Sequence, residues 1–129
     1  LSSQMSTMKK FMRAVRTLLE RGETILIYPE QSMWWNYRKP KPLKSGGFYF
    51  AAKNKVPVLP CFITMRDSSV IGADGFPVQE YTLNILPAIY PDKSVSIPEA
   101  KKKMREENYA AWVEVYESFY GMPLSYIKE

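Results

Sequence analysis

The sequence predicts an α/β fold in which helices pack on a mixed, largely parallel sheet that carries an antiparallel hairpin. A helix-spaced apolar pattern over residues 3–21 is followed at once by a continuous apolar run over 24–28, and a helical and then an apolar segment recur over 48–65. An Asp-Gly turn signal then separates two further strand-like segments. The 129 residues suffice for one hydrophobic core but not for two domains.

The first two elements are delimited by glycine and proline. Residues 3–21 place apolar side chains at steps of three and four, which predicts an amphipathic helix that ends at Gly22. The run over 24–28 is apolar at nearly every position, as in a strand covered on both faces of a parallel sheet, and Pro29 stops it.

A long loop separates this strand from the next helix and strand. Residues 30–45 show no periodicity and contain two prolines, and an ordered loop of this length is usually functional. Residues 48–55 predict a short helix, and residues 56–65 predict a second buried strand, parallel to the first.

The last third of the chain predicts a hairpin and a long helix. Residues 70–72 and 78–89 flank the Asp74-Gly75 turn signal, which predicts an antiparallel hairpin. Ser96 and Glu99 form a capping-box pattern, so a helix is expected from Ser96 to about Tyr120, before Gly121.

Composition excludes several classes of protein. The chain has no histidine, so it cannot supply a Ser/His or Cys/His catalytic pair by itself. The single cysteine, Cys61, permits neither an internal disulfide nor a zinc cluster, and we expect no metal and no cofactor. No apolar run reaches the length of a membrane span.

The net charge of +5 is concentrated in one window. Between Glu30 and Asp67 there is no acidic residue, and seven basic residues fall there: Arg38, Lys39, Lys41, Lys44, Lys53, Lys55 and Arg66. Aromatic residues, including Trp34, Trp35 and Tyr37, are interleaved with them. This pattern indicates an anionic partner, although a solvated basic face explains it equally well.

Three features of the loop are candidates for a ligand site. Glu30 follows the first predicted strand, where α/β sheets bind ligands, or it caps loop N–H groups. Lys44 and the glycines from Gly46 precede a helix and outline an anion site. Arg38 and Lys39 lie before two prolines that stiffen the loop, so that the arginine can face a phosphate.

Three ordered blocks carry a resemblance to a known family. They are Ile25-Leu26-Ile27-Tyr28-Pro29-Glu30-Gln31-Ser32, Pro42-Leu43-Lys44-Ser45-Gly46-Gly47-Phe48 and Val56-Pro57-Val58-Leu59-Pro60. This arrangement resembles the glycerolipid acyltransferases, specifically the 1-acylglycerol-3-phosphate acyltransferases. Their blocks read Phe-Pro-Glu-Gly-Thr-Arg-Ser, Phe-Lys-x-Gly-Ala and Val-Pro-Ile-Val-Pro, and the resemblance covers residues 5–65 well.

The resemblance implies roles for individual residues. Glu30 matches the glutamate of the family's glycerol-phosphate site, and Ser32 takes the place of its threonine. Lys44 and Gly46 match the Lys-x-Gly at the helix start. Two positions depart from the pattern, since Gln31 replaces a glycine and Met33 replaces the phosphate-binding arginine. From their position we expect Arg38 or Lys39 to supply the missing charge.

The family's catalytic element, His-x-x-x-x-Asp, has no counterpart here. The chain also opens on Leu1 rather than Met, so we expect residues 1–129 to be the C-terminal portion of a single acyltransferase domain whose catalytic N-terminal portion is absent. No catalytic residue is expected on this chain, and alone it should be inactive.

The resemblance also implies a reaction and partners. The parent enzyme would transfer an acyl group from acyl-CoA or acyl-carrier protein to lysophosphatidate in phospholipid synthesis, at the cytoplasmic face of a membrane. In this interpretation Glu30, Ser32, Arg38, Lys39, Lys44 and Gly46 bind the acceptor. We also expect self-association, because a chain lacking half its sheet would expose an apolar edge or face.

Two alternatives stay open at this point. One is a non-catalytic module that binds anionic lipid or nucleic acid through the basic aromatic loop 31–55, although a nucleic-acid partner is disfavoured because the aromatic residues cluster in one loop. The other is a divergent, histidine-free relative that binds its ligand without turning it over.

Overall fold

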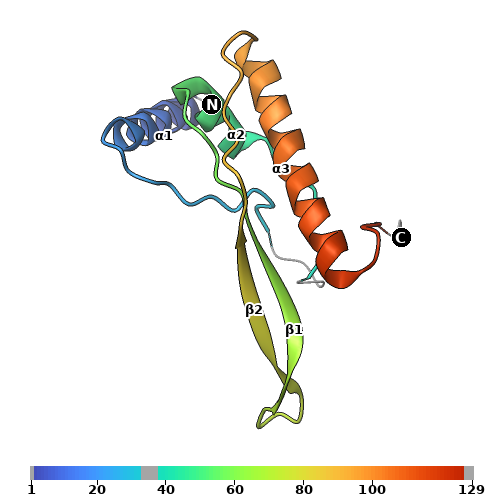
Figure 1. Cartoon of the computed structure of the whole chain (residues 1–129). Helices are drawn as coiled ribbons and strands as arrows, with labels where there is room; N and C mark the ends of the chain where they lie inside the picture. Colours follow the sequence, from blue (N-terminus) through green and yellow to red (C-terminus); the bar gives the residue numbers. More distant parts are fainter. Residues whose placement is uncertain (1, 33–37, 127–129) are drawn as a thin grey trace.

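The computed structural model describes residues 2–32 and 38–126 and shows three helices and one two-stranded sheet (Figure 1). The elements are α1 (Ser2–Glu20), α2 (Gly46–Asn54), β1 (Cys61–Ile71), β2 (Pro77–Ile85) and α3 (Ile97–Tyr120). The helices gather at one end, and the β1–β2 hairpin projects away from them. The chain is therefore α/β, as predicted, but the architecture differs in its sheet.

The two long helices form where the sequence predicts them. After α1, Gly22 adopts a left-handed conformation (φ 76°), and the N–H groups of Gly22 and Glu23 donate to carbonyls of the last helical turn. At the start of α3 the Ser96 side chain accepts a hydrogen bond from the Glu99 N–H at 3.3 Å, and Gly121 (φ 66°) ends the helix.

The core lies between α3, α2 and the start of β1. One face of α3 places a buried residue at every fourth position: Ala100, Met104, Asn108, Trp112 and Tyr116. This face packs on Phe48, Ala51 and Ala52 of α2 and on Phe62 of β1, whose ring lies 5.4 Å from that of Trp112. Leu43 joins the same core and so anchors the loop that precedes α2.

The strand predicted over residues 24–28 is not formed in the structure. The side chains of Leu26 and Tyr28 are about three-quarters exposed (76% and 75%). A strand needs a neighbour to satisfy its backbone groups, and within residues 2–32 and 38–126 none pairs with this segment. The largely parallel sheet that the sequence predicts is accordingly not seen in the described part of the chain.

The second predicted strand and the first hairpin arm are one element. Pro60 separates an isolated antiparallel bridge between Val58 and Ile89 from β1, which then continues to Ile71. β1 pairs with β2, antiparallel, in a register that opposes Ile63 to Leu83, with an irregularity between Asp67 and Ile71. The hairpin is thus confirmed, whereas the parallel pairing predicted for residues 56–65 is not seen in the part of the chain that the structure describes.

Among the residues that the structure describes, no helix has the combination of length and apolar character needed to cross a bilayer.

Candidate functional site

The turn that contains Glu30 is held against the loop that leads into α2. The N–H of Gln31 donates to the Tyr28 carbonyl at 3.0 Å, which closes a tight turn, and Gln31 occupies the left-handed region (φ 59°). The Lys44 N–H donates to the Pro29 carbonyl at 2.7 Å. Two segments that the sequence places about fifteen residues apart are therefore joined through their backbones.

Glu30 and Ser32 both contact Lys41. The half-buried Glu30 carboxylate accepts a hydrogen bond from the Lys41 backbone N–H at 2.6 Å. The Lys41 ammonium in turn donates to the Ser32 hydroxyl. Lys41 is thus fixed at both its backbone and its side chain, and a positive charge stands directly beside Ser32.

The same segments meet the N-terminus of α2. The two glycines allow this close approach. A Cβ atom at position 46 would lie 3.9 Å from the Gln31 amide nitrogen, and a Cβ atom at position 47 would lie 3.0 Å from the Ile27 side chain. Ser45 precedes the helix without capping it through its side chain. The backbone N–H groups that begin a helix lack partners within it, and together they carry a partial positive charge.

We call Glu30, Ser32, Lys41, Lys44 and Gly46 the Lys41 cluster. It joins two lysines, a hydroxyl and a helix N-terminus, which suit an anion, to a carboxylate, which can accept hydrogen bonds from hydroxyl groups. The Lys44 ammonium is exposed and has no hydrogen bond or ion pair within the described residues. The cluster can therefore present cationic and N–H groups to a phosphate ester without first breaking a Lys44 contact.

Arg38 and Lys39 are placed elsewhere. Arg38 lies 3.4 Å from the Asp67 carboxylate and from the Gln79 side chain, and its guanidinium stands 5.9 Å from the centre of the Tyr120 ring. Lys39 stacks on Tyr126, with its ammonium 4.8 Å from the ring centre. Arg38 thus contacts the hairpin and α3, and Lys39 contacts the C-terminal segment at Tyr126. Trp34, Trp35 and Tyr37 lie outside the described residues.

Tyr126 closes the site from the C-terminal side. Its hydroxyl donates to the Pro40 carbonyl at 2.6 Å and therefore accepts its hydrogen bond from Tyr109 of α3. Burial, the hydrogen bond with Tyr109 and the nearby Glu30 charge all raise the pKa of Tyr126, burial most strongly. The phenol thus stays protonated and ties the loop beside Glu30 to α3.

Lys41 and Tyr126 are not among the residues that the sequence predicts for the acceptor site. From the sequence, Lys41 is only one of seven basic residues in the same window, although its position between Pro40 and Pro42 is a signal, because two prolines restrict where it can point. Tyr126 gives no such signal, since its contact with Pro40 spans 86 residues.

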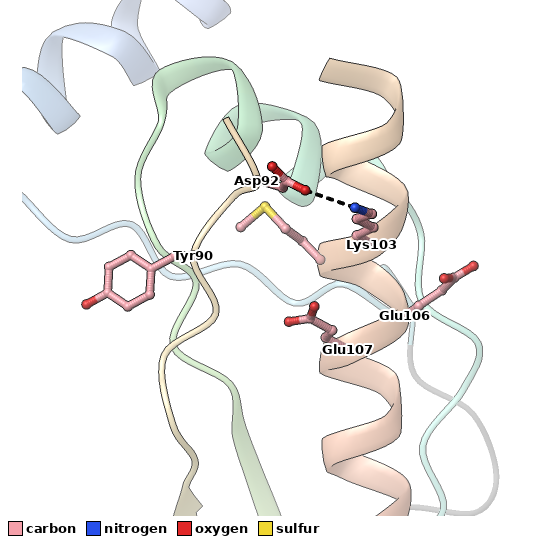
Figure 2. Close-up of a pocket in the computed structure, with 6 residues that line it drawn as sticks. Tyr90, Asp92, Lys103, Glu106 and Glu107 are labelled. Carbon is pink, nitrogen blue, oxygen red and sulfur yellow. Dashed lines mark hydrogen bonds and ion pairs between the residues drawn. The ribbon is translucent and has the colours of Figure 1, made fainter. Parts of the chain in front are cut away.

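A separate pocket between α3 and the segment that follows β2 has the opposite charge (Figure 2). It is lined by Tyr90, Asp92, Lys103, Met104, Glu106 and Glu107, and Lys103 donates to Asp92 at 2.9 Å. Hydrogen bonds from Ser94 and Lys103 lower the pKa of Asp92. Three carboxylates against one ammonium disfavour a phosphate ligand here. In the described part of the chain, no group of three or more potential metal-ligating residues comes together.

The part of the chain that contains the Lys41 cluster is similar to a known protein family. Residues 2–64 match the family model described as Acyltransferase. These residues, just under half of the chain, are therefore similar to the acyltransferase family. They include α1, the Glu30 turn, the loop and α2, and they end inside β1, so all five residues of the cluster lie within the acyltransferase match. This match confirms the family that the three sequence blocks resemble. Comparison with curated proteins and with solved structures finds no match.

Proposed function

We propose that this chain provides the acceptor phosphate-binding part of an enzyme that transfers an acyl group to lysophosphatidate. The acyl donor in this proposal is acyl-CoA or acyl-carrier protein, and the reaction takes place at the cytoplasmic face of a membrane. The observation that carries the proposal is the hydrogen-bonded Lys41 cluster inside the segment that is similar to the acyltransferase family.

The residues of the cluster divide the binding of a glycerol-phosphate head between them. Lys41, Lys44 and the first N–H groups of α2 attract the phosphate oxygens, because ammonium groups and helix N-termini both favour an anion. Glu30 holds the Lys41 backbone, and its second carboxylate oxygen can accept from a glycerol hydroxyl. Ser32 sets the position of the Lys41 ammonium.

In this proposal Lys41 takes the role that the sequence predicts for Arg38 or Lys39. Its ammonium already contacts Ser32, the neighbour of the position where the family has its arginine. Arg38 would have to leave Asp67 to reach the same phosphate.

No catalytic residue is assigned to this chain. In the family this chain resembles, a histidine removes the proton of the acceptor hydroxyl, and the 129 residues contain no histidine. We therefore propose binding without turnover for this chain alone, and the acyl-transfer step for the parent protein.

Calorimetric titration of the chain with glycerol-3-phosphate, and with a short-chain lysophosphatidate below its micelle concentration, tests the proposal. Each charge-assisted contact contributes about 1.5–3 kcal/mol, so Lys41→Met and Lys44→Met should each weaken binding by about tenfold or more. Lys53→Met removes the same charge from the far end of α2 and should leave binding unchanged. Glycerol, which lacks the phosphate, should not bind.

Equal losses in all three lysine variants would contradict a built site and indicate a general basic surface. The binding-module alternative makes a different prediction, since a single-stranded oligonucleotide would then outcompete glycerol-3-phosphate and its affinity would fall steeply with salt.

A further inference from the structure

The N-terminal helix α1 has an apolar stripe that the rest of the described chain contacts only at its Phe11 end. Met5, Met8 and Phe11 are spaced by three residues on one side of the helix, and each is more than half exposed (62%, 55% and 53%). Scattered exposed apolar residues are ordinary, but a row of three large ones along a helix is a potential contact surface.

The contacts that hold α1 leave Met5 and Met8 exposed. The helix is held through the buried Val15 and through an edge contact between Phe11 and Phe50 of α2, with ring centres 5.5 Å apart. Both contacts lie in its middle and C-terminal part. The whole helix lies at the end of the molecule away from the hairpin (Figure 1).

Basic residues border the stripe. Helix α1 contains four basic residues (Lys9, Lys10, Arg13 and Arg16) and one acidic residue (Glu20), a net charge of +3. Met5, Lys9 and Arg13 follow one another at steps of four, so they form a row beside the apolar residues. A shallow hollow on this side of the helix is lined by Met5, Ser6, Lys9, Lys10 and Arg13.

From this juxtaposition we infer that α1 docks on the surface of an anionic lipid bilayer, parallel to the membrane plane. A bilayer offers hydrocarbon for Met5 and Met8 and anionic headgroups for Lys9 and Arg13 along the full length of the helix. Nucleic acid would match the charge but offers no apolar surface for the methionines. A second copy of the chain would bring two helices of charge +3 together, which their repulsion opposes.

The inference rests on the membrane location in the proposed function and names the element that would dock there, but it does not depend on the proposed acyl acceptor. Membrane docking depends on α1 alone, whereas phosphate binding depends on the Lys41 cluster, so either can fail while the other holds.

Co-sedimentation of the 129-residue chain with vesicles tests the inference. Vesicles of phosphatidylcholine with one-third phosphatidylglycerol should bind the chain more tightly than pure phosphatidylcholine, and added salt should reduce the difference. The double variant Lys9→Glu/Lys10→Glu should weaken binding to anionic vesicles by about 25-fold or more, since the loss of each basic residue costs about fivefold and the added carboxylates repel the headgroups. Lys101→Glu/Lys102→Glu on α3 changes the net charge equally and should have little effect.

The apolar stripe has its own matched pair of variants. Met8→Asp should weaken vesicle binding by about tenfold or more, because it removes a side chain that enters hydrocarbon. Met122→Asp replaces a methionine of nearly the same exposure (52%) beyond α3 and should not. Circular dichroism of each variant confirms that helix content is retained.

A second measurement locates the helix directly. With Cys61 replaced by serine and Met5→Cys carrying an environment-sensitive fluorophore, anionic vesicles should shift the emission to the blue. Three results would overturn the inference: no binding to anionic vesicles, equal losses in the α1 and control variants, or self-association that Met8→Asp abolishes in a chain that ignores vesicles.

Discussion

Replacing Glu30 separates the structural role of its carboxylate from a role in ligand binding. In Glu30→Ala the Lys41 N–H loses an acceptor at 2.6 Å. Hydrogen bonds to charged groups contribute about 1.5–3 kcal/mol, and the lower end applies because the site is half-buried and water can replace the carboxylate. The entropy of unfolding of 129 residues is about 0.27 kcal/mol per kelvin, so a loss of about 1.5 kcal/mol lowers Tm by about 5–6 °C.

Glu30→Gln keeps an oxygen acceptor without the charge. A neutral hydrogen bond contributes about half as much, so the expected decrease in Tm is about 3 °C. Thermal unfolding followed by circular dichroism measures both variants, with Glu114→Ala on the exposed side of α3 as the control, expected within about 2 °C of the unchanged chain.

The outcome decides between the two interpretations of this carboxylate. If Glu30→Ala melts with the control, the contact with Lys41 does not stabilise the turn and the reasoning is wrong. If Glu30→Gln keeps most of its stability but loses glycerol-3-phosphate binding, the carboxylate acts on the ligand as well as on the loop. If Glu30→Gln retains both its stability and glycerol-3-phosphate binding, the Glu30 side chain only caps the loop.

Three further predictions concern other parts of the chain. Gln31→Gly should stabilise the chain by about 0.5–1 kcal/mol in chemical denaturation, because Gln31 has φ 59° and glycine adopts that region without strain; destabilisation would mean that the Gln31 side chain matters more than its backbone. The pKa of Asp92 is lower in the folded state than its ordinary value of 3.8. Asp92 therefore contributes to the free energy of unfolding above pH 3.8, and this contribution disappears as the pH falls through the lower pKa of the folded state. Asp92→Asn should therefore flatten the acid side of a plot of stability against pH, and an unchanged acid limb would refute this. Leu83 is 58% exposed on the outer face of the hairpin, so Leu83→Lys should reduce the self-association that we predict, and light scattering that finds the unchanged chain monomeric would contradict it.

The elements that could be predicted from the sequence are those whose signals are local. Helix α3 begins at a serine that caps it and ends at a left-handed glycine, both visible within a few residues of the boundary. The hairpin turn is equally local, since Asp74 accepts from the Phe76 N–H and Gly75 has φ 83°. Helix α1 follows from its apolar spacing and from Gly22.

The sheet could not be predicted in the same way, because a strand depends on a partner that the segment does not contain. The apolar run 24–28 has the composition of a covered strand, but within the described residues it has no strand partner, and its Ile27 lies against Gly47. In β1, the polar residues 67–69 do not end the strand, because pairing with β2 carries it past them with a local irregularity.

Contacts with distant residues decide which basic side chain lies beside Ser32. Arg38 and Lys39 both stand within a few residues of Ser32, but Asp67 and Tyr120 engage the first, and Tyr126 stacks on the second. Those partners lie 29 to 87 residues away along the chain, so no local pattern reveals them. Lys41 remains beside Ser32 because its own backbone is bound to Glu30. The side chain that meets the anion is therefore selected by the contacts of its neighbours as much as by its own position, and a double variant of Arg38 and Lys39 should leave glycerol-3-phosphate binding intact where Lys41→Met does not.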